Sequence, residues 1–234
     1  EVTGNGSRTI YAWVWNPSHN VEETVISWSR RGGPAGTHTA LNHGWHPTWG
    51  AVAHWDAPDI GWNGTQEAGI WTCLAYTYDS STGLVSVYTN GQLANSKTIA
   101  PLNVKTGAPF VVGCENSSSG FRDNNQLPGS LTIAKIKVHD VALNAAEIAT
   151  TYNADAPTFG RTAAPVPLVL SSFAAGSEAI HRGDSTTLSW SVSGHDTLSV
   201  TPGPALSPET ASLAVTPLVT TTYTLTVTGP GGPK

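Results

Sequence analysis

The sequence of 234 residues has no methionine, only two cysteines and few charged residues, and each shortage narrows the possibilities. Lysine and arginine number 11 against 16 acidic residues, so the net charge is -5. A protein that binds nucleic acid needs clustered basic residues to neutralise phosphates, so the balance argues against that partner. No apolar run approaches the roughly 20 residues of a transmembrane helix, so we predict no membrane span.

The two cysteines, Cys73 and Cys114, lie in separate strand-like runs, WTCLAYTYD and PFVVGCENS. If these strands are neighbours in an exported protein, the two residues could form a disulfide. Two buried thiols are an equal alternative, because a buried cysteine packs like a small apolar side chain. The chain has neither an initiator methionine nor a signal peptide. We therefore expect a fragment of a longer exported polypeptide, extracellular or on the cell surface.

Short strands joined by tight turns are what the abundant Thr, Ser, Gly, Asn and Pro favour. The predicted strands of the first part are 8–16, 23–31, 39–45, 50–55, 69–79, 83–91, 109–114 and 130–140. A β-hairpin is predicted with a loop at 79–83, followed by a tight turn at Asn90-Gly91. One short helix is expected at 143–154, with Asn144 as its cap. These patterns predict an all-β, antiparallel sandwich.

The composition changes near residue 155, where DAPTFGRTAAPVP is rich in proline and alanine and lacks periodicity. We predict a first domain at 1–157, a linker at 158–167 and a second domain at 168–234. The second domain contains VLSSFA, STTLSWSVSG, TLSVTPG, ASLAVTP and TTYTLTVTG. These short strands predict a small sandwich with Trp190 at its centre.

Several segments of the first domain together resemble a laminin-G-like jelly roll of the concanavalin A-like lectin/glucanase superfamily. They are RTIYAWVWNPS, SWSRRGGPAGT, GAVAHWDAPDIGW, WTCLAYTYDSSTGLVSVYTNG, PFVVG and GSLTIAKIKVHDVALNAAEI. The resemblance covers roughly residues 7–155 and implies a jelly-roll β-sandwich that binds a ligand. Residues 168–234 resemble a bacterial immunoglobulin-like module, which implies a smaller sandwich that acts as a spacer.

No pattern of catalytic residues is found in the sequence. Glucanases of this superfamily carry E-x-D-x-x-E or E-x-D-x-E on one strand, which places two carboxyl groups at hydrolysis distance. Glu22 and Glu23 are adjacent, so on a strand they would point to opposite faces. No G-x-S-x-G elbow is present either. We therefore predict no catalytic residues and no enzyme activity.

Two kinds of metal site are conceivable in this sequence. Zinc at His43, His46 and His54 is disfavoured, because H-x-x-H in a loop is a weak signal without further ligands. The resemblance implies that calcium is possible at the rim of the sandwich, where hard oxygen ligands gather. The candidate calcium ligands are Asp56, Asp59, Asp123, Asn124 and Asn125. Solvated turn residues are the alternative. Many family members carry an aspartate in the late strand where this chain has Ala134, which weakens the transfer.

Seven of the nine tryptophans divide into two groups. Trp13, Trp28 and Trp71 are predicted to pack in the core between the sheets, together with Val25, Ile26, Leu74 and Tyr76. The second group, residues 45, 49, 55 and 62, lies beside Gly, Pro, His and Asp, as aromatic residues do in sugar sites. The candidate ligand-binding residues are Trp45, Trp49, Trp55, Trp62, His54 and Arg31. The alternative is that these residues lock the loop, with Arg31 stacked on an indole.

These observations predict a non-catalytic extracellular module that binds a glycan or a protein partner, as in bacterial adhesion. The first alternative is a structural building block that self-assembles at the cell surface without a small ligand. The second is a polysaccharide-active hydrolase.

Overall fold

Strand β1 (Arg8–Trp15) shows how alternating side chains build the first sandwich. The computed structural model places Ile10, Ala12 and Val14 in the core between two sheets, while Trp13 lies on the opposite face of the strand. This division follows from the two-residue period of a strand.

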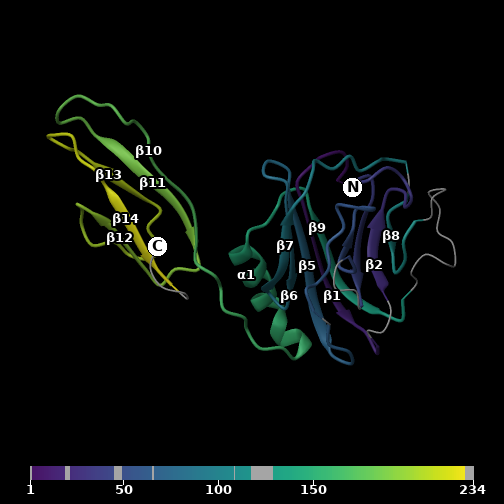
Figure 1. Cartoon of the computed structure of the whole chain (residues 1–234). Helices are drawn as coiled ribbons and strands as arrows, with labels where there is room; N and C mark the ends of the chain where they lie inside the picture. Colours follow the sequence, from purple (N-terminus) through teal and green to yellow (C-terminus); the bar gives the residue numbers. More distant parts are fainter. Residues whose placement is uncertain are drawn as a thin grey trace. The chain divides into compact units, whose positions relative to one another are not determined.

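The structure describes residues 2–18, 22–44, 49–64, 66–107, 109–116 and 129–229. The chain divides into two units, one of residues 1–144 with 151–164, the other of residues 145–150 with 165–234 (Figure 1). Each has its own hydrophobic core.

The first unit contains two antiparallel sheets that face each other as layers (Figure 1). The five-stranded sheet has the order β7-β6-β5-β1-β9, with β5 (Trp71–Asp79), β6 (Leu84–Thr89), β7 (Gln92–Thr98) and β9 (Thr132–His139). The four-stranded sheet has the order β4-β3-β2-β8, with β2 (Glu23–Trp28), β3 (Thr39–His43), β4 (Val52–Ala53) and β8 (Val111–Val112). The predicted all-β antiparallel sandwich is confirmed.

The core between the sheets is mainly aliphatic, with a few large aromatic residues. Trp28, Leu41, Trp62 and Tyr76 are at most 1% exposed and belong to it. The prediction was wrong for Trp71, which does not belong to this core.

Trp13 and Trp71 instead contact aromatic residues that follow the last strand of the first unit. Phe159 lies in the short helix η1 (Ala156–Phe159) and stacks on Trp13 with 4.1 Å between ring centroids. Trp71 meets the same ring at 5.0 Å, and Trp13 also stacks on Tyr152 at 5.5 Å. Tyr152 belongs to α1 (Ala145–Asp155), close to the predicted helix at 143–154. Trp13 is therefore buried but packs outside the core between the sheets, so the prediction that it lies between the sheets was wrong for Trp13 as well.

The second unit contains five strands in two small sheets. One has the order β10-β11-β13, with β10 (Val169–Ala175), β11 (Thr186–Ser193) and β13 (Ser212–Val215). The other pairs β12 (Thr197–Thr201) with β14 (Thr224–Thr228). Trp190 lies in the core with Leu188, Leu198 and Val227.

The two cysteines are buried thiols and not a disulfide. Cys73 is paired in register with Trp13 in the five-stranded sheet, whereas Cys114 follows β8 of the other sheet. Of the two alternatives for this pair, the packed thiols are the one observed. Within the described part of the chain, no helix has the length and apolar character to cross a membrane.

Candidate functional site

The loop of residues 54–62 is held in place mainly by hydrogen bonds to its own backbone. The carboxylate of Asp59 accepts the His54 amide at 2.6 Å. From β7, Lys97 Nζ donates to the carbonyls of Ala57 at 2.9 Å and Asp59 at 2.8 Å. Asn95 Nδ2 on the same strand donates to the Gly61 carbonyl at 2.9 Å. These bonds fix the path of the loop without using most of its side chains.

Trp55 and Asp56 occupy a strained turn at the tip of this loop. Their φ angles are 74° and 67°, in the left-handed region that non-glycine residues rarely adopt. Such strain costs on the order of 1–3 kcal/mol per residue and is concentrated at functional sites. The turn leaves the Trp55 indole partly exposed, with the Arg31 guanidinium 5.6 Å from the ring centroid.

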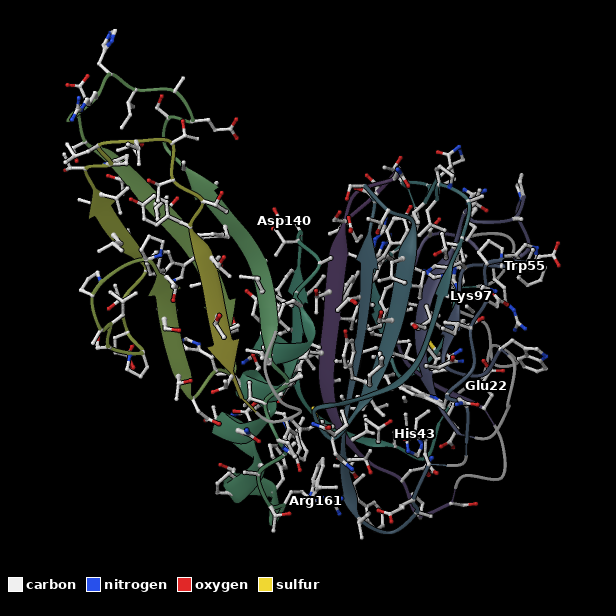
Figure 2. All side chains as sticks on the ribbon, turned by 60° about the vertical axis from the view of Figure 1, so that its left-hand side comes forward. Glu22, His43, Trp55, Lys97, Asp140 and Arg161 are labelled. Carbon is white, nitrogen blue, oxygen red and sulfur yellow. The ribbon has the colours of Figure 1, made fainter. Side chains whose placement is uncertain are left out.

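Arg31 connects this indole to a polar cluster on the four-stranded sheet. Arg31 Nε lies 3.2 Å from Glu115 Oε2, and Glu115 is 1% exposed. Asn42 on β3 donates from Nδ2 to Glu22 Oε1 at 2.5 Å and reaches Glu115 Oε1 at 3.5 Å. We call Trp55, Arg31, Glu115, Asn42 and Glu22 the polar row. Its labelled ends, Trp55 and Glu22, lie on the same side of the first unit (Figure 2).

Burial and neighbouring charges shift the pKa values of the titratable groups in and beside this row. Burial, followed by the charge of Glu115, raises the pKa of Glu22 to about 7. Burial also raises the pKa of Glu115, although the Arg31 charge and Asn42 oppose it. His38 Nε2 lies 3.9 Å from Glu115 Oε2, and burial lowers the pKa of His38 to about 3, so this imidazole is neutral near pH 7. The row therefore holds two carboxyl groups, of which Glu115 forms an ion pair with Arg31 and Glu22 is influenced by the Arg31 charge.

The predicted ligand-binding residues have different environments. Trp49 is 45% exposed and Trp55 is partly exposed, so both offer ring surface to a ligand. Trp62 is 1% exposed and packs in the sandwich core, so it has no surface for a sugar. His54 is fully buried, with Nε2 at 2.7 Å from the Tyr76 hydroxyl and Nδ1 at 3.1 Å from the Pro58 carbonyl. Trp45 lies outside the described residues.

Of the candidate calcium ligands, Asp56 and Asp59 lie among the described residues. Asp56 is exposed, while Asp59 already accepts a backbone amide. The other calcium candidates, Asp123, Asn124 and Asn125, lie outside the described residues. No three His, Cys, Asp or Glu side chains converge as metal ligands among the residues that the structure describes. Calcium therefore stays a prediction.

The two described histidines of the zinc alternative are hydrogen-bonded inside the protein. His43 Nδ1 lies 2.9 Å from Asn16 Nδ2, and His54 is bonded as given above. His46 lies outside the described residues. Each of these two imidazoles therefore uses at least one ring nitrogen in a hydrogen bond within the protein.

Sequence reasoning missed the centre of the polar row. Glu22 is next to Glu23 in the sequence, but Glu23 bonds to Asn16 and Ser130. The partner of Glu22 is Asn42, whose Nδ2 also reaches Glu115 from the segment after β8. A polar Asn42 between Leu41 and His43 in a buried strand was the one local signal, because a buried amide needs partners.

Comparison with known proteins is consistent with this fold. The model of the family described as concanavalin A-like lectin/glucanases superfamily matches residues 1–149. The search of curated proteins gave no match.

Among solved structures, the sialidase domain CBM40 of Ruminococcus gnavus, bound to α2,3-sialyllactose, is similar with a TM-score of 0.50 at 15% identity. The match covers 62% of this chain and 83% of that chain. A candidate carbohydrate-binding protein from Bacteroides ovatus ATCC 8483 gives 0.49 at 19% identity over 62% of this chain and 40% of that one. Domain 4 of the extracellular arabinanase AbnA from Geobacillus stearothermophilus, in complex with arabinotriose, gives 0.45 at 21% identity, covering 63% of this chain and 66% of that chain. At these identities the likeness concerns the fold.

Proposed function

The chain belongs to the concanavalin A-like lectin/glucanase superfamily, and from this premise we propose that its first unit is a non-catalytic module that binds a glycan outside the cell. The second unit is proposed as an immunoglobulin-like spacer. Carbohydrate-binding proteins among the similar structures support the choice of ligand class.

The observation that carries the proposal is the strained turn of Trp55. A sugar site combines an aromatic face with polar groups that meet the hydroxyls. Trp55 supplies the aromatic face. Arg31 lies beside it and forms an ion pair with Glu115, so a polar side chain is close to that face. Because Asp59 and Lys97 hold the loop, the indole is positioned before a ligand arrives, which lowers the entropic cost of binding.

A glycan array followed by calorimetry on the best ligand tests the proposal. We expect Trp55→Ala to weaken binding at least tenfold, about 1.4 kcal/mol, because the stacking face is lost. Trp49→Ala, at the other exposed indole, shows whether the site extends to that residue. Leu93→Ala is the matched control, since Leu93 is a large apolar residue 56% exposed on β7. Unchanged affinity of Trp55→Ala, or no glycan bound by the intact protein, would refute the proposal.

Glycoside hydrolysis is the second candidate, and one observation favours it. Glu22 and Glu115 both lie within reach of Asn42 Nδ2, and Glu22 has the raised pKa of a general acid. Against it, Glu115 is 1% exposed and paired with Arg31. We therefore expect no release of reducing sugar from a polysaccharide panel. Turnover by the intact protein that disappears in Glu22→Gln would replace binding by catalysis.

A further inference from the structure

The dipeptide Asn-Gly occurs at three places in the sequence, Asn5-Gly6, Asn63-Gly64 and Asn90-Gly91. Such a pair is chemically reactive, because the amide nitrogen of the glycine can attack the side-chain carbonyl carbon of the asparagine. Glycine has no Cβ atom to obstruct the attack, and it adopts backbone angles that other residues avoid. Whether the reaction occurs in the folded protein depends on how firmly the fold holds these two groups, and the three pairs differ in this respect.

The fold holds both reacting groups of the pair Asn5-Gly6. Asn5 Oδ1 accepts hydrogen bonds from the Tyr78 hydroxyl and from the Leu102 amide, the latter at 2.9 Å. The Gly6 amide is also occupied, because it donates to the Thr3 carbonyl at 3.2 Å. These hydrogen bonds must break before a ring can close, and each broken bond slows the reaction.

The pair Asn90-Gly91 is held in the turn between β6 and β7. Asn90 Oδ1 accepts the Cys73 amide at 3.0 Å, and the Asn90 amide donates to the Cys73 carbonyl at 2.8 Å. Gly91 is buried, and a Cβ atom added to it would lie 2.8 Å from Tyr152 Cδ1. Hydroxide, which must remove the proton of the attacking amide, therefore has little access to Gly91.

The pair Asn63-Gly64, which follows the 54–62 loop, is exposed at both residues. Neither the Asn63 side chain nor the Gly64 amide forms a hydrogen bond with any residue that the structure describes. A Cβ atom at Gly64 would meet nothing within 4 Å, so there is room for the Asn63 side chain to rotate toward the backbone. Both reacting groups of this pair are therefore open to each other and to solvent.

We propose that Asn63 is a site of spontaneous deamidation, with the Gly64 amide nitrogen as the nucleophile. The bond from this nitrogen to Asn63 Cγ forms and the bond from Cγ to Nδ2 breaks. The side-chain nitrogen leaves as ammonia, with the proton of the backbone amide. A water molecule then opens the succinimide ring at either carbonyl and gives aspartate or isoaspartate. The net change replaces an amide by a carboxylate beside the 54–62 loop, and it needs no oxidant, reductant or enzyme.

This modification goes beyond the proposed glycan binding and does not depend on it. Incubation of the intact folded protein at mildly alkaline pH, in water enriched in heavy oxygen, tests the site. Ring opening incorporates the heavy oxygen, so mass spectrometry of peptides separates deamidation during incubation from deamidation during digestion. We expect Asn63 to react about tenfold faster or more than Asn5 and Asn90, because those two must first break hydrogen bonds. A rate at Asn63 no higher than at the other two would overturn the proposal.

The same protein unfolded in guanidinium chloride provides the reference, because the three pairs then differ little in chemistry. We expect similar rates at the three asparagines in denaturant, and a much smaller loss of rate on folding at Asn63 than at Asn5 and Asn90. If Asn63 were faster by the same factor in denaturant, the local sequence and not the fold would set its rate. That result would overturn the assignment to the structure.

Two variants identify the nucleophile. Gly64→Ala adds a Cβ atom beside the attacking nitrogen and should slow deamidation at Asn63 about tenfold. Gly107→Ala is the matched control, because Gly107 also has a positive φ and open space around its missing Cβ. The control should leave the rate at Asn63 unchanged. An unchanged rate in Gly64→Ala would mean that water hydrolyses the Asn63 amide directly, against the proposal.

Discussion

At the scale of single residues, the aromatic side chains are sorted by the face of the strand that carries them. Trp28 points between the sheets, while Trp13 points outward and stacks on Phe159 and Tyr152. The sequence correctly places Trp13 opposite Ala12 and Val14, because strand alternation is local. It does not reveal which face meets the other sheet, since both faces of a covered sheet are apolar. That explains the errors at Trp13 and Trp71.

The polar row makes a testable prediction about pH. The pKa of Glu22 is raised to about 7 in the folded protein, above its ordinary value of 4.5. The folded state therefore holds this proton more strongly, and that stabilisation is complete below pH 4.5 and lost as the pH rises through about 7. The Glu22→Gln variant has no titratable group at this position, so its stability does not fall in this way. We expect the difference in free energy of unfolding, variant minus wild type, to increase between these pH values.

Urea unfolding of both proteins across this pH range checks the expectation. Two buried histidines, His38 and His54, have pKa values lowered to about 3 and give the opposite dependence below pH 6.5. They are present in both proteins and cancel in the difference. A difference that is constant with pH would mean that Glu22 is not buried beside Glu115 in solution.

At the scale of elements, the turns between β5, β6 and β7 explain how these three strands pair. Asp79 accepts hydrogen bonds from Ser81 and Thr82 at one turn, and Asn90 and Gly91 have φ of 50° and 77° at the next. This pair of positive angles is the I′ geometry for which Asn-Gly is selected. The predicted hairpin and turn are therefore confirmed.

Gly91 offers a second prediction, because a side chain there would meet another element. A Cβ atom at Gly91 would lie 2.8 Å from Tyr152 Cδ1, whereas one at Gly107 meets nothing within 4 Å, and both glycines have positive φ. We expect Gly107→Ala to cost about 1 kcal/mol of backbone strain. Gly91→Ala should cost at least about 1 kcal/mol more, since Tyr152 must move. Chemical unfolding measures both, and equal costs would count against the contact with Tyr152.

The fold was more predictable than the site. Most strands carry apolar alternation, so β1, β5, β6 and β9 were found close to their true bounds. Strand β7, QLANSKT, has no such pattern because it is a largely polar strand at the edge of its sheet. The polar row joins Glu22, before β2, to Glu115, after β8. Strand pairing brings these distant segments together, and no local pattern records that.

At the scale of the whole chain, two separate cores imply two cooperative units. We expect two transitions in calorimetry. Leu41→Ala in the first core and Leu198→Ala in the second should each lower one transition, by about 2–5 kcal/mol of that unit's stability. The other transition should keep its midpoint. A single transition that moves with either substitution would show that the units unfold as one.

The attachment of the 54–62 loop has a consequence for how this protein can vary. Lys97 and Asn95 hold the carbonyls of Ala57, Asp59 and Gly61, and a carbonyl is the same whichever residue carries it. Exposed positions outside the left-handed turn, such as Ala57, can therefore change while the loop keeps its path. Directed evolution could diversify these positions to alter ligand preference without rebuilding the sandwich.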